Sequence, residues 1–297
     1  MASRDPRRLL VTGATGFLGR ELVPRALERF ESVVCFVRPS SDLSQLPRSG
    51  RLEFQFGDLA CPGELAAALA EVDALLNLAS LGKGHADVIV GDAVAAGVPR
   101  AVFVSTTAIF TKLNAPSKLE RMRAEQLIEG SGLNFTILRP TMIYGRSRDR
   151  NMARLVKTIR RYPVLPIPGW GKNLQQPVYV GDVARACLDV LHHSQTIGNA
   201  YSVSGAYPLT YREVVRTVTG LLGVRTVLLP LPAGQVIHLL ALLEGMGLTL
   251  PIKAEQIKRL NEDKAFAYGD ARRDFGYAPL DFAGGMHLQL EEMGLLP

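Results

Sequence analysis

Short apolar runs alternate with stretches of helical periodicity through the first 140 residues. The apolar runs show little internal alternation with polar residues, which is typical of parallel strands covered by helices on both faces. The expected strands are 9–14, 32–38, 52–55, 73–78, 101–105 and 134–139. The expected helices between them are 17–30, 63–70, 86–97 and 117–129. The pattern therefore predicts an α/β fold with a doubly wound parallel sheet of the Rossmann type.

The pattern loosens after residue 140. A basic helix is expected over 151–161, and a loop rich in Pro and Gly follows. Residues 177–191 and 200–203 resemble a return to the sheet, and a helical tail begins near residue 207. We predict a dinucleotide-binding domain from residues 1–140, with 177–205 returning to the sheet. The remaining residues, 141–176 and 206–297, are expected to form a smaller C-terminal substrate-binding cap.

Composition narrows the class of protein. Three cysteines without C-x-x-C spacing predict neither a disulfide framework nor a metal site, and they favour the cytoplasm. The chain runs directly into its first strand, so we expect no signal peptide. The most apolar stretch, 227–250, is broken by Pro, Gly and Glu, which argues against a transmembrane segment and leaves a lid or a peripheral docking surface open. The net charge of +6 comes without a nucleic-acid motif, so we expect no nucleic acid and favour an anionic cofactor or substrate.

The segment LLVTGATGFLGRELV carries the strongest signal. Gly13, Gly16 and Gly19 stand between an apolar strand and a helix, where glycines permit a tight turn and a close approach of the backbone to a pyrophosphate. The N–H groups that begin the helix favour a negative charge. We therefore predict that this turn binds a dinucleotide, together with its neighbours Thr15, Phe17 and Leu18.

The end of the second expected strand indicates which dinucleotide. Arg38 follows the last glycine by about 20 residues, where NAD-selective sites carry an acidic residue. A guanidinium suits a 2′-phosphate, and Ser40 and Ser41 can add hydroxyl donors. We predict NADP, with NAD less favoured. The alternative is a solvated Arg38, with Asp42 on the ribose of NAD.

Several motifs in order resemble the short-chain dehydrogenase/reductase superfamily, in its extended or atypical branch of NAD-dependent epimerases and dehydratases. TGATGFLG resembles TGxxGxxG, and Gly57-Asp58-Leu59 resembles a turn whose Asp faces the adenine. NLAS, FTILRPTMIYG and QPVYVGDVA resemble further segments of that branch. The resemblance implies additional cofactor-binding residues, namely Asp58, Leu59, Leu78, Ala79, Ser80, Ser105, Thr106, Pro140, Thr141 and Met142.

The catalytic residues depart from the family pattern. The resemblance implies a Ser or Thr, a Tyr and a Lys, and it assigns the hydroxyl role to Thr107. Counting back from Glu125 places Arg121 at the Lys position and Ser117 at the Tyr position, so the usual YxxxK motif is missing. Serine is a poor proton donor near neutral pH, and arginine hardly deprotonates. Other candidate acids are Tyr144, Lys118 and Tyr179, with a packing role as the alternative for Tyr144.

Candidate substrate contacts follow the sixth expected strand. Arg146 and Arg148 can bind an anionic group such as the diphosphate of a nucleotide sugar. Trp170 and Tyr179 can line a substrate pocket, although Trp170 can equally close its loop. The basic residues of the 151–161 helix are expected to form a solvated face.

Two functions remain open from the sequence. The first is an NADP(H)-dependent oxidoreductase, or an epimerase-like enzyme, that acts on a hydroxyl or carbonyl of a small substrate. The second is a nucleotide-binding scaffold, sensor or assembly factor without hydride transfer, because a fold alone does not fix a function. The resemblance also implies that a homodimer is compatible with the fold.

Overall fold

The computed structural model describes residues 6–147, 149, 151–246 and 254–296. The chain divides into two compact units, each built from three segments. Unit 1 contains Met1–Thr141, Val180–Val203 and Ala267–Ala278. Unit 2 contains Met142–Tyr179, Ser204–Phe266 and Pro279–Pro297.

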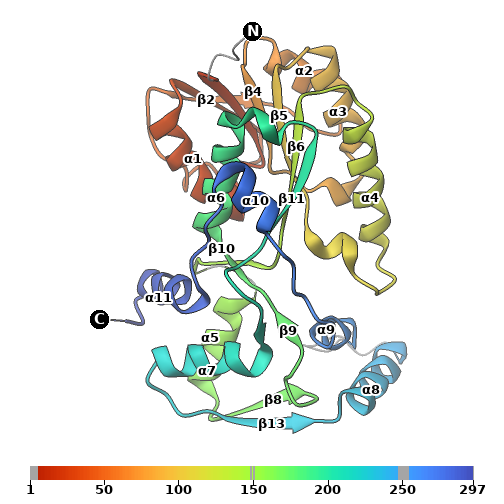
Figure 1. The fold of residues 1–297 in the computed structure, drawn as a ribbon, viewed down its shortest axis with the longest axis vertical. Helices are drawn as coiled ribbons and strands as arrows, with labels where there is room; N and C mark the ends of the chain where they lie inside the picture. Colours follow the sequence, from red (N-terminus) through yellow and green to blue (C-terminus); the bar gives the residue numbers. More distant parts are fainter. Residues whose placement is uncertain (1–5, 148, 150, 247–253, 297) are drawn as a thin grey trace. The chain divides into compact units, whose positions relative to one another are not determined.

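A seven-stranded sheet in the order β11-β6-β5-β4-β1-β2-β3 forms the centre of unit 1 (Figure 1). Its strands are β1 (Arg8–Thr12), β2 (Ser32–Val37), β3 (Leu52–Phe56), β4 (Ala74–Asn77), β5 (Arg100–Val104), β6 (Phe135–Pro140) and β11 (Asn199–Val203). Every neighbouring pair is parallel, so all the carboxyl ends lie at one edge of the sheet. The predicted parallel Rossmann sheet is confirmed.

The sheet has its topological switch point beside β1. This strand pairs with β2 on one side and with β4 on the other, and Thr12 lies opposite both Phe36 and Asn77. The chain therefore winds away from β1 in both directions. Ligands of open α/β sheets bind at such a point, outside the carboxyl ends of the strands.

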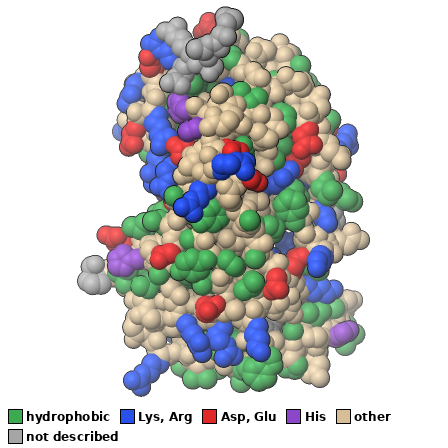
Figure 2. All heavy atoms as spheres, in the orientation of Figure 1, with side chains coloured by type: hydrophobic (Ala, Val, Ile, Leu, Met, Phe, Trp, Pro, Cys, Tyr) green, Lys and Arg blue, Asp and Glu red, His purple; other side chains and the backbone are tan. Residues whose placement is uncertain are grey.

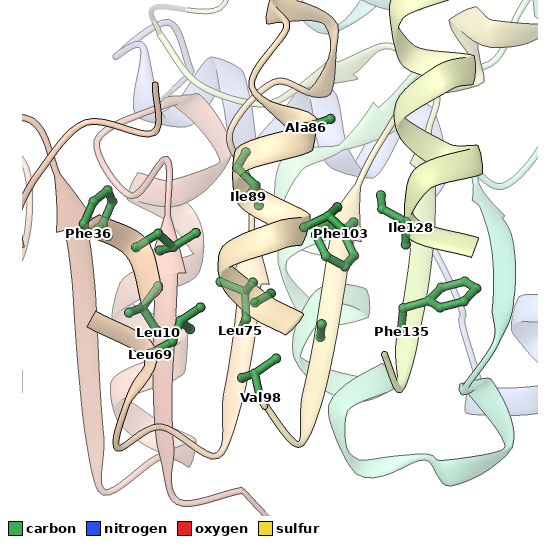
Figure 3. Packing of buried hydrophobic residues seen from close by; sticks show 14 of the residues in the cluster. Leu10, Phe36, Leu69, Leu75, Ala86, Ile89, Val98, Phe103, Ile128 and Phe135 are labelled. Carbon is green, nitrogen blue, oxygen red and sulfur yellow. The ribbon is translucent and has the colours of Figure 1, made fainter. Parts of the chain in front are cut away.

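Helices cover both faces of this sheet (Figure 1). One face carries α2 (Glu64–Leu69), α3 (Ala86–Ala95) and α4 (Pro116–Glu129), and the other carries α1 (Phe17–Arg29) and α6 (Val180–Asp189). Figure 3 shows the core under the first group, where labelled side chains of the strands meet those of the helices. Examples from the strands are Leu75 and Phe103, and examples from the helices are Ile89 and Ile128, all with no exposed surface. Burial of these apolar faces explains why the strands lack a polar alternation.

The segment 177–191 differs from its predicted return to the sheet. Residues 180–189 form α6, whose buried side recurs at helical spacing through Val180, Val183, Ala184 and Cys187. The return is made by β11 alone, which pairs with β6 at the edge of the sheet. Short apolar runs do not distinguish a buried strand from one buried helix face, which explains the difference.

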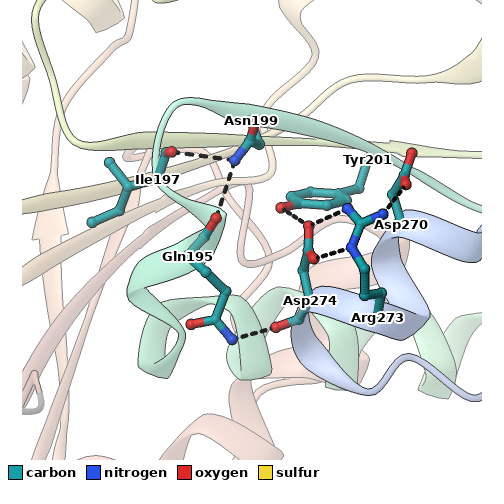
Figure 4. A network of polar contacts seen from close by, with 7 residues as sticks. All are labelled: Gln195, Ile197, Asn199, Tyr201, Asp270, Arg273 and Asp274. Carbon is teal, nitrogen blue, oxygen red and sulfur yellow. Dashed lines mark hydrogen bonds and ion pairs between the residues drawn. The ribbon is translucent and has the colours of Figure 1, made fainter.

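A polar network attaches α10 (Gly269–Phe275) to β11 in unit 1 (Figure 4). The Tyr201 hydroxyl donates to Asp274 Oδ2 at 2.8 Å, and Arg273 pairs with Asp274 and Asp270. Burial and the hydrogen bond to Asp274 raise the pKa of Tyr201 to about 12. The remaining short helices of unit 1 are η1 (Leu81–Lys83), η2 (Thr107–Phe110), η3 (Val190–His192) and η4 (Ser194–Thr196).

Unit 2 packs helices against three two-stranded sheets. Its strands are β7 (Ile143–Tyr144), β8 (Val164–Pro168), β9 (Leu174–Gln175), β10 (Val178–Tyr179), β12 (Leu209–Thr210) and β13 (Val227–Leu231). Its helices are α5 (Met152–Arg161), α7 (Tyr211–Leu221), α8 (Ala233–Gly245), α9 (Ala254–Leu260) and α11 (Phe282–Glu292). A separate apolar core joins α5, α7, α11 and β8, with Val156, Ile167, Val218 and Met286 among its buried side chains.

Candidate active site

Glycines shape the turn between β1 and α1. Gly13 has a φ of +70°, and a Cβ there would lie 2.9 Å from the Ala79 nitrogen. A Cβ on Gly19 would lie 2.5 Å from the Gly13 oxygen, so a side chain would collide with the backbone of the turn. The Gly16 N–H donates to the Gly13 carbonyl at 2.9 Å, which closes the turn. The turn therefore packs too closely to accept side chains at Gly13 and Gly19.

The amino end of α1 has no side chain that competes with a ligand. Gly16 caps the helix without a side-chain hydrogen bond, and the first turn contains no acidic residue. Arg20 stabilises the loop, since its Nε donates to the Thr15 carbonyl at 2.9 Å. The first N–H groups of the helix and its dipole thus favour an anion here.

A buried hydrogen bond joins β1 to β4 beneath the turn. The Thr12 hydroxyl donates to Asn77 Oδ1 at 2.6 Å, and Asn77 Nδ2 donates to the Ala79 carbonyl at 3.1 Å. These bonds position the backbone of Leu78 and Ala79 against Gly13, with Ser80 exposed beyond them. Thr12 is not among the site residues that the sequence predicts. A polar residue at the end of a fully buried strand is the signal that points to it.

The adenosine side of the site lies at the ends of β2 and β3. Arg38, directly after β2, is exposed, and its guanidinium has no hydrogen bond or ion pair within the part of the chain that the structure describes, although its carbonyl accepts from the Ser41 N–H at 2.9 Å. Ser40 is exposed and Ser41 is half-buried, and the Asp42 carboxylate accepts from the Ser44 N–H at 2.9 Å. This leaves the Arg38 guanidinium available to an anionic ligand.

The turn after β3 is held by an acidic side chain. The Asp58 N–H donates to Glu64 Oε2 at 2.7 Å, and Asp58 Oδ1 accepts from the Ala60 N–H at 3.0 Å. Asp58 is exposed and Leu59 is half-buried. The sheet thus places both residues at the same edge as the glycine turn.

Three hydroxyl residues follow β5. The Ser105 Oγ is buried and has no hydrogen-bond partner among the residues that the structure describes. Thr106 accepts from the Ala108 N–H at 3.2 Å and caps η2, while the buried Thr107 hydroxyl donates to the Pro140 carbonyl at 3.3 Å. A buried polar atom without a partner costs stability, so the Ser105 hydroxyl is an orphaned group that a bound ligand can satisfy.

The predicted pair on α4 is in contact. Arg121 Nη1 donates to the Ser117 Oγ at 3.0 Å, one helical turn away. The Arg121 guanidinium also lies against Gly82 of η1, where a Cβ would come within 3.1 Å of its Nε. The Lys118 side chain does not join this pair, because its Nζ donates to the Thr111 carbonyl at 2.6 Å. The structure therefore brings Ser117 and Arg121 together beside the segment that follows β4.

A buried ion pair fixes α4 to β6. Glu125 is 4% exposed, and both its oxygens accept from Arg139, with the Nη2–Oε2 distance at 2.5 Å. The Arg139 guanidinium lies 5.5 Å from the ring centre of Phe110. After β6, the Thr141 N–H donates to the Val203 carbonyl at 3.1 Å. The pair orients the helix that carries Ser117 and Arg121.

The remaining candidate residues belong to unit 2. Tyr144 is 1% exposed, its hydroxyl donates to the Phe282 carbonyl at 3.3 Å, and its ring packs against Tyr179 and Phe282. Met142 packs on the unit 2 core, and the Arg146 carbonyl accepts from Gln289 at 2.9 Å. Trp170 is 65% exposed. Arg148 lies outside the described residues.

Comparison with known proteins assigns the family. Residues 13–194 match the NAD(P)H-binding family model, and the chain belongs to this family. The 2-alkyl-3-oxoalkanoate reductase of Stenotrophomonas maltophilia (strain K279a) is 27% identical over 316 residues, which cover 92% of this chain and 94% of the relative.

Solved structures agree with this assignment at the level of the fold. The structure of gox2253 superposes with a TM-score of 0.80 at 22% identity, over 99% of this chain and all of that one. The dTDP-glucose 4,6-dehydratase DesIV of Streptomyces venezuelae, solved with NAD and TYD bound, has a TM-score of 0.74 at 21% identity over 97% of both chains. The predicted NAD(P)-binding family and the predicted fold are confirmed.

The site in unit 1 fits a nicotinamide dinucleotide. The glycine turn packs so closely that a Cβ on Gly13 or Gly19 would collide with backbone, the first turn of α1 offers free N–H groups, and the Ser105 hydroxyl has no partner among the described residues. These features occur along one sheet edge, at the ends of β1 and β5. The cradle is formed mainly by backbone, as pyrophosphate binding requires.

Proposed function

We propose that the chain is an NADP(H)-dependent oxidoreductase that acts on a carbonyl or hydroxyl group of a small substrate. The observation that supports this most directly is the contact between Arg121 and Ser117 beside Gly82. It provides a positive charge and a hydroxyl on α4, while the glycine turn of the same unit supplies a dinucleotide cradle. A protein that only bound the nucleotide would not need a polarised hydroxyl on α4.

The nicotinamide, when bound, supplies or accepts a hydride. The residues of this chain have three tasks around it. The turn at Gly13 and Gly16 binds the pyrophosphate through backbone N–H groups, and Arg38 binds the 2′-phosphate that distinguishes NADP from NAD. Ser105 is proposed to hydrogen-bond the cofactor, because its buried hydroxyl has no protein partner.

In this proposal, serine and threonine hydroxyl groups contact the substrate oxygen in place of a tyrosine phenol. We assign the orientation of that oxygen to Thr107 and the stabilisation of its developing negative charge to Ser117, with Arg121 increasing the polarity of the serine hydroxyl. Donors that point at a developing oxyanion account for a large part of many rate enhancements. The proton that completes an alcohol then comes from solvent, because serine is a weak acid near neutral pH.

The substrate class follows from the relatives and stays a proposal. The 2-alkyl-3-oxoalkanoate reductase suggests a 3-oxo acid or a similar carbonyl compound, whereas the dehydratase suggests a nucleotide sugar. In unit 2, Arg146, Trp170, Tyr179 and Arg148 are the proposed substrate contacts. An arginine suits the carboxylate of the first class and the diphosphate of the second equally well.

The test is turnover of NADPH with a panel of 3-oxo acids, ketones and nucleotide sugars. For a substrate that reacts, Arg121→Gln is expected to lower kcat about a hundredfold, as loss of an oxyanion donor does. Arg123→Gln is the matched control, because Arg123 lies on the same helix and reaches only the exposed Asp87, at 3.6 Å. Equal kcat values for the two variants would overturn the role of Arg121.

The second candidate is a nucleotide-binding scaffold, and the replacement of the family tyrosine by Ser117 favours it. The same panel separates the two functions. Tight NADPH binding with no turnover of any substrate would support the scaffold and contradict the enzyme.

A further inference from the structure

An apolar sheet face lies on the outside of unit 2. β8 and β13 pair in parallel, with Val164 opposite Val227 and Pro166 opposite Leu229. These side chains are exposed, Val227 by 64% and Leu229 by 48%, whereas the alternate positions Leu165 and Ile167 are buried in the core. The outward side of this two-stranded sheet therefore presents only hydrophobic groups.

Helix α8, which follows β13, also exposes apolar side chains. One residue, Pro232, separates α8 from β13, and α8 has no buried residue, although most of its side chains are apolar. Leu239, Leu242 and Met246 are 57%, 63% and 69% exposed, and their spacing of three and four residues places them on one stripe. Exposed apolar surface on several neighbouring elements marks an interaction site rather than scattered hydrophobic residues.

Arginines stand at the start of both strands. Arg160 and Arg161 precede β8, and Arg225 precedes β13, so the parallel pairing brings them to the same end of the sheet. All three are exposed and have no ion-pair partner among residues that the structure describes. Tyr162 lies between the arginines and Val164 in the chain and is 56% exposed. Figure 2 shows Lys and Arg side chains beside hydrophobic ones over the β13 region.

We propose that this surface, formed by β8, β13 and α8 with Arg160, Arg161 and Arg225, docks the protein on a membrane that contains anionic lipid. Apolar side chains would enter the boundary between headgroups and acyl chains, while the arginines pair with lipid phosphates. Tyrosine favours that boundary because its ring is apolar and its hydroxyl is polar. No helix in the described ranges could span a bilayer, so the attachment would be peripheral.

Charge favours a lipid surface over a second copy of the chain. A symmetric contact uses the same patch on both copies, so it would bring two sets of unpaired arginines into one interface. Like charges oppose such a contact, whereas an anionic surface pairs with every arginine at once. The proposal is independent of the reaction that the protein catalyses.

The experiment measures binding to vesicles by co-sedimentation. Vesicles of phosphatidylcholine mixed with phosphatidylglycerol are expected to bind the protein, and vesicles of phosphatidylcholine alone are expected to bind it much more weakly. Added salt should weaken the first interaction, because it screens the arginines. Absence of binding to the anionic vesicles would overturn the proposal.

Matched variants test the surface itself. Leu242→Gln should lower the vesicle partition coefficient about tenfold, whereas Leu119→Gln, on α4 and equally exposed at 65%, should leave it unchanged. Arg225→Gln should lower it about fivefold, and Arg48→Gln is its exposed control in unit 1. Circular dichroism spectra establish that each variant is folded.

The oligomeric state of the protein tests the alternative occupant of this surface, a second copy of the chain. A dimer that dissociates in Leu242→Gln, together with vesicle binding that Leu242→Gln leaves unchanged, would assign the surface to a second copy and overturn the lipid proposal. A monomeric protein that loses vesicle binding in both Leu242→Gln and Arg225→Gln would support the lipid proposal.

Discussion

The β1–α1 turn and helix α4 belong to one unit but present different kinds of chemistry. The turn is shaped by Gly13, Gly16 and Gly19, and its ligand-binding groups are backbone N–H groups. Helix α4 contributes side chains instead, with Arg121 on Ser117 and both held by the buried pair of Glu125 with Arg139. We propose that binding of a dinucleotide depends on the first region and that the chemistry depends on the second.

The two regions differ in how strictly they depend on the identity of a side chain. Backbone N–H groups are the same in every sequence, so the turn needs only that its glycines stay small. A proton donor needs a particular pKa, and replacing a phenol by the Ser117 hydroxyl changes that pKa greatly. The sequence therefore predicts the fold and the class of cofactor more directly than it predicts the reaction.

The largest effect is expected from a methyl group in the turn. Gly16→Ala should weaken binding of NADPH about a hundredfold, equivalent to about 2.7 kcal/mol, because the new Cβ projects where the phosphates approach. The residue has a φ of −75° and a ψ of 176°, which alanine adopts readily. Its Cβ would lie 3.1 Å from the Gly13 oxygen, so the free energy of unfolding should fall by only about 1 kcal/mol.

Calorimetric titration and chemical denaturation of the same variant separate binding from stability. Gly50→Ala is the control, since a Cβ there meets nothing within 4 Å. Unchanged NADPH affinity in Gly16→Ala would show that the turn is not the pyrophosphate site, and the contrast with α4 would then lose its basis.

A smaller effect on NADPH affinity is expected from Arg38, at the adenosine end of the cofactor site. Arg38→Gln should weaken NADPH about thirtyfold by loss of charge-assisted hydrogen bonds, while the affinity for NADH should stay the same. Arg38 is exposed and unpaired within the described chain, so its replacement should not change the free energy of unfolding. Dissociation constants for both nucleotides, with Arg51→Gln as an exposed control, test this.

The result decides between the two cofactors. An equal loss of affinity for NADPH and NADH would mean that Arg38 does not recognise the 2′-phosphate. Asp42 would then become the better candidate for contact with the ribose of NAD.

The sequence predicts those parts of the site that depend on local pattern. The glycine spacing, the succession of strands and helices and the positions of Ser117 and Arg121 four residues apart all follow from neighbours in the chain. The contact of Arg121 with Gly82 and the orphaned Ser105 hydroxyl depend on how α4 and β5 pack. Such contacts join residues distant in sequence, and no periodicity encodes them.

The position of α10 and the role of Tyr144 also depend on contacts between residues that are distant in sequence. The Tyr201 hydroxyl and the Gln195 amide both donate to Asp274 and attach a late helix to β11 and η4, although nothing in the pattern of the tail indicates these partners. Tyr144 also looked chemically suitable in the sequence because a tyrosine can donate a proton. Its usefulness depends on burial, which only the packed structure reveals.

The smallest effect is expected at Tyr144, and it tests whether unit 2 contributes a catalytic acid. The hydroxyl donates to the Phe282 carbonyl and lies against Gly285, so it has a structural role in the unit 2 core. Tyr144→Phe should lower the free energy of unfolding by about 1 kcal/mol and leave kcat unchanged. Tyr207→Phe, with a 48% exposed ring, should change neither quantity. A fall in kcat of about a hundredfold at constant stability would make Tyr144 the acid, and the chemistry would then no longer reside on α4 alone.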